Sequence, residues 1–287
     1  MVAVHGPIVV GADGSEGAAR AVRWAAAEAD SRSVPLHVVN ATALDTWGHL
    51  PSEPVARSVL DEGLAVVNDA VAQAEKEAPG IRVTARVSRD AAAEALLDAA
   101  GSDGLVVVGS RGAGGFPALL LGSVGLRVAA CAQAPVVVVR GESEPAATGV
   151  VLVAVRDARD LDVLRFAAET AKRRRAALHV LSVYSYHQYA GSMVPVLGDL
   201  AEVAEEQAAS VARLVRPVSD AFPDLPVTTE AARAHSLAGA VVDATARADL
   251  LVVGAHRPAH APGKPLGRFV HVVLHHAHCP VAVVPIA

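Results

Sequence analysis

Short runs of apolar, mostly β-branched residues recur along the first half of the chain, and turn-forming residues separate them. Such runs, without regular alternation of polar residues, are typical of strands buried on both faces of a parallel sheet. The first two read IVVGA and LHVVNA. The five predicted strands cover residues 8–12, 36–41, 81–87, 105–110 and 135–140.

Helical patterns fill the gaps between these runs. Ser15 is a candidate N-cap, because its hydroxyl can accept a hydrogen bond from a free N–H group of the first helical turn. The helix predicted after it places four small apolar residues on one face, namely Val22, Ala25, Ala26 and Ala29. Further helices are predicted at 55–78, 91–101 and 123–133. This alternation predicts an α/β fold, a doubly wound parallel sheet with helices on both faces.

The second half of the chain repeats the pattern of the first. LHVLSV (178–183) matches LHVVNA, and three further runs match at 150–155, 249–255 and 279–285. The segment between the halves, GESEPAATG, is polar and rich in small residues, as linkers are. The repeat therefore predicts two tandem domains, residues 1–142 and 149–287, each with a five-stranded parallel sheet.

Residues 109–125 read GSRGAGGFPALLLGSVG, with far more glycine than a simple connection needs. Glycine permits a positive φ and lets another group lie against the backbone. That group is either the protein's own chain or the phosphates of a ligand. In doubly wound sheets, ligands bind beyond the carboxyl ends of the strands where the strand order reverses. If the first and fourth strands are neighbours, Asp13 and Gly109 face one crevice.

The end of this loop also favours an anion. Gly122, Ser123 and Val124 open a helix, whose unpaired N–H groups and positive dipole end attract phosphate. Ser123 can cap this helix or donate its hydroxyl to a phosphate oxygen, and Arg111 adds a positive charge. The alternatives are a plain glycine turn and, for Asp13, a solvated turn aspartate.

The spacing Gly109-x2-Gly112-x9-Gly122-Ser123, with VVGADGS upstream, resembles the ATP-binding signature of the universal stress protein family. The resemblance covers essentially the whole chain as a tandem of two such domains. It implies the strand order 3-2-1-4-5 in each domain. It also implies an ATP-binding, stress-response regulatory protein whose nucleotide occupancy sets conformation or partner choice.

The same resemblance implies a set of site residues for ATP and Mg²⁺ in the first domain. Asp13 would hold the ribose or the phosphate-bound Mg²⁺, and the backbone near Ala41 and Val108 would contact adenine. Glycine-rich backbone would surround ribose and phosphates. The full expected set is Gly11, Asp13, Ala41, Val108, Gly109, Ser110, Arg111, Gly112, Gly114, Gly115, Gly122, Ser123 and Val124.

The second domain departs from the signature. Arg156 stands at or beside the counterpart of Asp13, and Arg257 and Arg268 replace Gly112 and Ser123. A side chain at 257 removes the freedom for close backbone approach. Lys264 and these arginines can still attract a phosphate as point charges. The preferred interpretation is one competent site and one degenerate copy, in which Gly254 and Gly267 remain.

The sequence favours a binding protein over an enzyme, with no catalytic residue assigned. A Walker loop places Lys and Ser/Thr after its last glycine, whereas the glycine loop here contains no lysine. A slow nucleotide hydrolase, a flavin-using enzyme and a scaffold that binds no nucleotide are the alternatives.

Histidines gather near the C-terminal end. His271, His275 and His278 recur at helical spacing, which is compatible with Zn²⁺. No second segment clearly supplies further ligands, so a solvated or interface helix face is expected instead of a metal site.

Composition limits the partners. The formal net charge of −5 provides no basic field for nucleic acid. Two cysteines, no signal-peptide pattern and no membrane-length apolar run favour a cytoplasmic protein without a membrane partner. The closing strands, 135–140 and 280–287, are edge strands in the implied order. Because apolar edges invite pairing, the two halves are expected to pair through them, with a homodimer or larger homo-oligomer as a further expectation.

Overall fold

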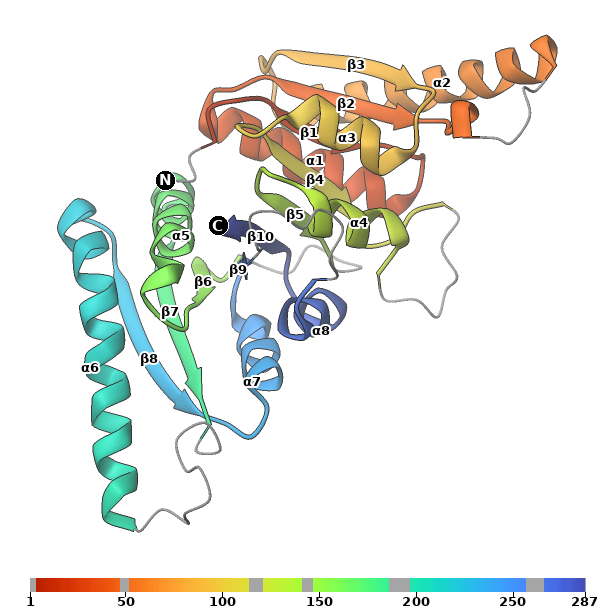
Figure 1. Cartoon of the computed structure of the whole chain (residues 1–287). Coiled ribbons are helices and arrows are strands. Elements are labelled where there is room, and N and C mark those ends of the chain that lie inside the picture. The colour runs from red at the N-terminus through yellow and green to blue at the C-terminus, as the bar shows by residue number, and fades with distance from the viewer. Residues whose placement is uncertain are drawn as a thin grey trace. The chain divides into compact units, whose positions relative to one another are not determined.

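The computed structural model of the chain describes residues 4–46, 52–113, 121–140, 147–185, 197–256 and 266–286. These residues form two compact units that divide after Arg140. Each unit is an α/β fold built on a parallel sheet, and both are drawn in Figure 1. The predicted doubly wound fold is therefore confirmed for both halves of the chain.

The first unit contains five parallel strands in the order β3-β2-β1-β4-β5. This is the order 3-2-1-4-5, so the first and fourth strands are neighbours and the strand order reverses between them. The strands are β1 (Ile8–Gly11), β2 (Leu36–Ala41), β3 (Val83–Ser88), β4 (Leu105–Gly109) and β5 (Val136–Val139). The helices are α1 (Glu16–Arg32), η1 (Leu44–Thr46), α2 (Glu53–Glu77), α3 (Ala92–Ala100) and α4 (Ser123–Cys131).

Helices cover both faces of this sheet. Helices α1 and α2 contact each other on one side, and α3 and α4 contact each other on the opposite side (Figure 1). The predicted apolar face of α1 is buried, with Ala25, Ala26 and Ala29 fully inaccessible. Ser15 caps this helix as predicted, since its Oγ accepts a hydrogen bond from the Ala18 N–H at 3.2 Å. Small side chains let α1 lie close to the strands.

The third strand begins later than its apolar pattern indicates. The prediction starts at Ile81, whereas β3 begins at Val83. Gly80 has a φ of +98°, and the Ile81 N–H donates to the Ala78 carbonyl, so Ile81 belongs to the turn that follows α2. Turn geometry thus takes precedence over the β propensity of isoleucine at this position.

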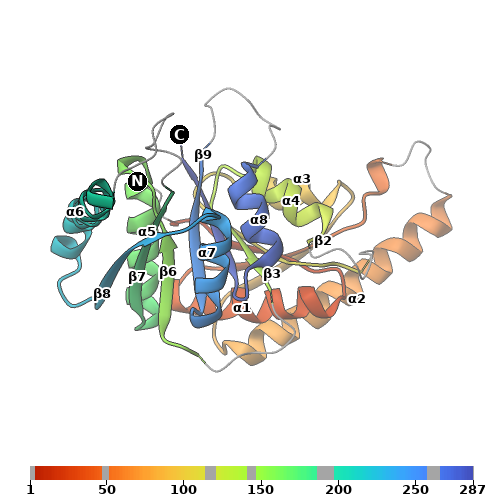
Figure 2. The same ribbon diagram turned by 90° about the horizontal axis from the view of Figure 1, so that it is seen from below.

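The second unit has the corresponding order, β10-β9-β6-β7-β8. Helices α5 and α6 contact each other, as do α7 and α8 (Figure 2). The strands are β6 (Val150–Ala154), β7 (Ala177–Tyr184), β8 (Val227–Arg233), β9 (Leu250–His256) and β10 (Val281–Ile286). The helices are η2 (Ala158–Asp160), α5 (Leu161–Arg174), α6 (Leu197–Ala221), α7 (Leu237–Ala244), η4 (Thr245–Arg247) and α8 (Arg268–His276).

None of the helices in the described part of the chain is both long and apolar enough to cross a membrane.

Candidate functional site

Asp13 joins the turn after β1 to the loop after β4. Its Oδ1 accepts hydrogen bonds from the Ser15 N–H at 3.1 Å and from the Ser15 hydroxyl at 2.6 Å. Its Oδ2 accepts a hydrogen bond from the Ala113 N–H at 2.8 Å. Gly14, between Asp13 and Ser15, has a φ of +78°. Asp13 is exposed, as a solvated turn aspartate would be, but it also fixes the position of the glycine loop.

Three glycines let that loop lie directly on the start of α1. A Cβ added at Gly109 would lie 2.7 Å from the carbonyl carbon and oxygen of Gly17. A Cβ at Gly17 would collide with the carbonyl oxygen of Arg111, and a Cβ at Gly112 would collide with Asp13 Oδ2. None of the three has a positive φ. At these positions glycine therefore serves close approach of the chain to itself, which is the plainer of the two alternatives.

Gly122 differs from these three glycines. A Cβ added there would lie 3.7 Å from the Ser110 carbonyl oxygen and 3.9 Å from Arg111 Cα, which is ordinary van der Waals contact. Its φ of −77° and ψ of 158° suit any residue. Its N–H donates to the Ser110 carbonyl at 2.8 Å. No described atom packs closely enough to require glycine at this position.

The start of α4 corrects the role predicted for Ser123. Gly122 is the N-cap, and Ser123 is the first helical residue, so its hydroxyl does not cap the helix. No side chain among the described residues makes a capping hydrogen bond to this helix. Ser123 is exposed, and Val124 is 38% exposed despite its apolar side chain. The N–H groups of the first turn thus have no side-chain partner in the described chain.

Three further predicted residues lie at or near the carboxyl ends of neighbouring strands: Gly11, Ala41 and Val108. Val108 is 4% exposed, so only its backbone can face a ligand. A Cβ at Gly11 would lie 3.3 Å from Leu96 Cδ1, so this glycine accommodates α3. Because β1, β2 and β4 are parallel, their ends meet at the edge of the sheet that carries Asp13.

Ser110 and Arg111 follow β4 at the same edge and are partly buried, while Gly114 and Gly115 lie outside the described residues. The sequence analysis did not assign two other groups here, Gly17 and the Ala113 N–H. Gly17 carried a usable signal, because glycine inside a helix costs about 1 kcal/mol and so calls for a packing reason. The Ala113 N–H carried none, because a backbone donor has no sequence signature.

The sheet register places Arg156 at the counterpart of Asp13. Ile8 pairs with Leu105 at the start of β4, and Val151 pairs with Leu250 at the start of β9. Counting the same number of residues onward from Ile8 and from Val151 reaches Asp13 and Arg156. The substitution predicted from the sequence is thus confirmed, and the carboxylate that binds the loop in the first unit is absent at this position.

The same count brings Asp160 to the position of Gly17. Asp160 is 4% exposed, and its Oδ2 accepts a hydrogen bond from the Arg156 N–H at 2.7 Å. A side chain there occupies the space through which the Arg111 carbonyl approaches α1 in the first unit. At the start of α8, Gly267 is the N-cap and Arg268 is exposed, while Arg257 and Lys264 lie outside the described residues.

Asp157 is held by neighbouring cations. Its carboxylate accepts hydrogen bonds from Arg159 Nε at 2.9 Å and Nη2 at 2.7 Å, and from the Arg159 N–H at 3.0 Å. Arg156 Nε lies 3.8 Å away. The side-chain hydrogen bonds from Arg159 are the main cause that holds the pKa of Asp157 well below its usual range. This carboxylate is engaged with arginine and does not replace Asp13.

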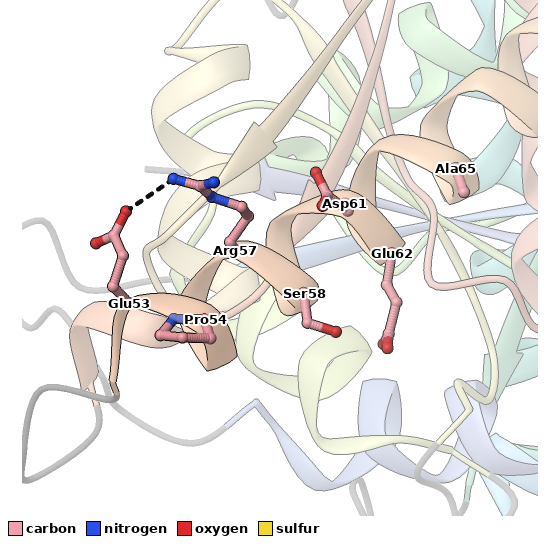
Figure 3. Close-up of a pocket in the computed structure, with 7 residues that line it drawn as sticks. All are labelled: Glu53, Pro54, Arg57, Ser58, Asp61, Glu62 and Ala65. Atoms are coloured by element: carbon pink, nitrogen blue, oxygen red, sulfur yellow. Dashed lines mark hydrogen bonds and ion pairs between the residues drawn. The ribbon is translucent and has the colours of Figure 1, made fainter.

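A groove of about 610 Å³ runs along the first turns of α2, and Figure 3 shows the side chains that line it. All seven come from this one helix: Glu53, Pro54, Arg57, Ser58, Asp61, Glu62 and Ala65. Glu53 and Arg57 form an exposed pair at 3.3 Å. Because no strand end contributes to it, this groove is distinct from the edge that carries Asp13.

The histidines near the C-terminus only partly share a helix face. His271 and His275 stack with ring centroids 4.4 Å apart, as their helical spacing predicts. The prediction is wrong for His278, because α8 ends at His276 and Ala277 is extended. Among the described residues, no group of three or more His, Cys, Asp or Glu side chains is placed to hold a metal ion.

Comparison with known proteins agrees with this architecture. A family model described as the universal stress protein family matches residues 5–140 and again residues 148–285. A universal stress protein of Mycolicibacterium smegmatis is 31% identical, with 96% of each chain covered. One from Mycobacterium tuberculosis is also 31% identical, covering 97% of this chain and 96% of its own.

Among solved structures, a universal stress protein from Archaeoglobus fulgidus has the same fold. Its TM-score is 0.69 at 16% identity, with 97% of this chain and 98% of that one covered. The family model and the relatives cover both halves of the chain. The chain therefore belongs to the universal stress protein family, as a tandem of two of its domains.

Proposed function

We propose that the first unit binds ATP together with Mg²⁺, and that nucleotide occupancy sets the conformation or the partner choice of a stress-response regulatory protein. Gly122 carries the proposal. No described atom packs closely enough to require glycine at this position, and a phosphate group can approach a backbone that carries no side chain. The uncapped first turn of α4 lies beside it and offers N–H donors and a positive dipole end.

Asp13 fits the role of the carboxylate that holds Mg²⁺. Each of its oxygens already accepts hydrogen bonds from the described chain, yet a carboxylate has about four acceptor sites in all. The side chain is exposed at the strand edge. Mg²⁺ in nucleotide sites typically uses one or two carboxylates together with phosphate oxygens and water. Backbone near Ala41 and Val108 would then contact adenine.

The second unit is proposed to lack this site. Arg156 stands where Asp13 stands in the first unit, and Asp160 stands where Gly17 admits the Arg111 carbonyl. The Asp157 carboxylate, which is the nearest alternative, is bound to Arg159. One ATP per chain is therefore expected.

Assembly and location complete the proposal. β5 and β10 each close the strand order of their unit, and both are apolar and unbroken. We propose that the halves pair through these strands and that the chain forms homo-oligomers. The cytoplasm is the proposed location, since it supplies ATP and keeps Cys131 and Cys279 reduced.

Calorimetry on three full-length proteins tests the nucleotide site. The wild type should bind one equivalent of ATP with Mg²⁺. Gly122→Glu should abolish binding, because its side chain fills the phosphate space and adds like charge. The fold should survive, since a carboxylate at a helix start is favourable. Gly267→Glu is the matched control, because Gly267 is also an N-cap with no described atom near its Cβ position.

Undiminished binding in a folded Gly122→Glu protein would show that the loop is only a turn. Two equivalents in the wild type, with one lost in Gly267→Glu, would show that the arginines of the second unit hold a phosphate after all.

A further inference from the structure

The second unit contains a cavity of about 290 Å³ at the carboxyl ends of β6 and β7. The turn after β6 forms one side and α6 forms the other. Its apolar lining comes from both: Val155, Leu161, Val211, Leu214 and Pro217. Arg156, the counterpart of Asp13, lines it, whereas the described residues at the start of α8 do not.

The helix that lines this cavity differs from its counterpart in the first unit at a glycine. Helices α2 and α6 have equal lengths and end equally far before β3 and β8, which aligns Gly63 with Gln207. A Cβ at Gly63 would lie 2.7 Å from Asn40 Oδ1 and 2.9 Å from Val87 Cγ1. Helix α2 therefore rests directly on the end of β2, and any side chain at this position would force it outward.

The residue at the end of the strand next to this helix also differs between the two units. Leu36 pairs with Ile8 and Leu178 pairs with Val151, so the register aligns Asn40 with Ser182. In the first unit, Asn40 fills this space, and its Nδ2 donates to the Ala12 carbonyl at 2.8 Å. In the second unit, the shorter Ser182 stands in place of Asn40, and the longer Gln207 stands in place of Gly63 on the helix. Both Ser182, at the end of β7, and Gln207, on α6, line the cavity.

Ser182 gives the cavity a polar floor. Its side chain is 4% exposed and lines the cavity. Within the described part of the chain, no hydrogen bond joins its hydroxyl to another residue. A serine hydroxyl both donates and accepts hydrogen bonds, so it can pair with a polar atom of a ligand in the cavity.

Two arginines line the cavity, Arg156 from the turn and Arg213 from α6. The lining carboxylate, Asp157, lies within ion-pair distance of Arg156 and is also bound by Arg159. Arg213 forms no ion pair with any described residue. The two guanidinium groups and one carboxylate of the lining sum to a single positive charge, which suits one negative charge on a ligand.

We propose that this cavity binds a small monoanion with a mainly apolar body, of the class of aromatic or branched carboxylic acids. The apolar body lies against Leu214 and its neighbours, and the carboxylate faces Arg213 and Arg156. The volume is at the lower end of the range for ligand sites, which suits one or two rings. The site is independent of the nucleotide proposed for the first unit.

The test uses the full-length protein with indole-3-acetate and with indole-3-acetamide, which has nearly the same shape but no charge. Ligand-observed NMR should show saturable binding of the acetate, with the amide at least about tenfold weaker. Arg213→Gln should weaken acetate binding about tenfold. Arg216→Gln, an exposed arginine of the same helix that does not line the cavity, should leave it unchanged.

Leu214→Trp should fill the cavity and abolish acetate binding, with circular dichroism to confirm the fold. If that variant fails to fold, Arg213→Gln still tests the proposal, because Arg213 is exposed and its substitution should not disturb the fold. The proposal is overturned if indole-3-acetate does not bind saturably, or binds as tightly to Arg213→Gln as to the wild type. Displacement of the acetate by ATP would also overturn it, because the two ligands would then share a site. ATP binding by the same samples is measured separately.

Discussion

The contrast between Gly109 and Gly122 leads to a prediction that separates packing from ligand binding. Alanine at Gly109 would bring its Cβ to 2.7 Å from backbone atoms of Gly17, in the first turn of α1. Backbone cannot yield as a side chain end can, so the helix or the strand must shift. Overpacking of this kind costs about 1–3 kcal/mol of folding free energy.

Alanine at Gly122 meets no atom of the described chain closer than 3.7 Å and needs no change of φ. The loss of conformational freedom in the unfolded chain stabilises the protein by about 0.4–1 kcal/mol, but alanine is a poorer N-cap than glycine by a similar amount, so the two effects nearly cancel. Gly122→Ala should therefore be more stable than Gly109→Ala by about 1–3 kcal/mol, the overpacking cost at Gly109. Its affinity for ATP should nevertheless fall at least about tenfold, since the added methyl group lies where phosphate approaches.

Denaturation followed by tryptophan fluorescence measures this difference selectively. The two tryptophans, Trp24 and Trp47, are both in the first half of the sequence, so the signal reports on the first unit. Gly267→Ala, the matched control in the second unit, should change neither the fluorescence transition nor ATP binding. Equal destabilisation by Gly109→Ala and Gly122→Ala would refute the reasoning, because both glycines would then serve packing. Unchanged ATP affinity in Gly122→Ala would refute the proposal that phosphate approaches the backbone at Gly122.

Three other predictions follow from the site and the charges around it. The pKa of His37 is lowered by burial and by the neighbouring arginine Arg86. The contribution of His37 to folding stability is therefore present above about pH 6.5 and is lost as the pH falls through the folded pKa. Arg86→Gln should raise the pKa of His37 in an NMR titration. Arg159→Gln should raise the pKa of Asp157 toward the usual aspartate range, detected by carboxyl NMR, because it removes the hydrogen bonds that stabilise the charged form. Residues 1–145 expressed alone should dimerise through β5, and a strict monomer at high concentration in light scattering would contradict this.

Much of the fold was predictable because apolar runs and helical periodicity repeat in both halves of the chain. The segment 36–41 matches β2 exactly, since strand, hydrophobic pattern and bounding turns all agree there. The predictions were wrong at the ends of strands and helices, where local hydrogen bonds determine the boundary. Ile81 joined a turn instead of a strand, and Ser123 lost the cap position to Gly122, whose extended backbone conformation is the one an N-cap adopts.

The meaning of each glycine was not predictable, because a glycine in a sequence does not say which atom approaches it. Gly109 and Gly112 looked like Gly122 in the motif, yet the first two closely approach the protein's own backbone and Asp13, whereas the third has only ordinary van der Waals neighbours among the described residues. Gly63 lies outside the motif, yet its counterpart Gln207 lines a cavity in the other unit. Close approach of a helix depends on pairs of residues far apart in the chain. Two units with the same strand order can therefore differ in local packing where a side chain replaces a glycine, as at Gly63 and Gln207 and at Gly17 and Asp160.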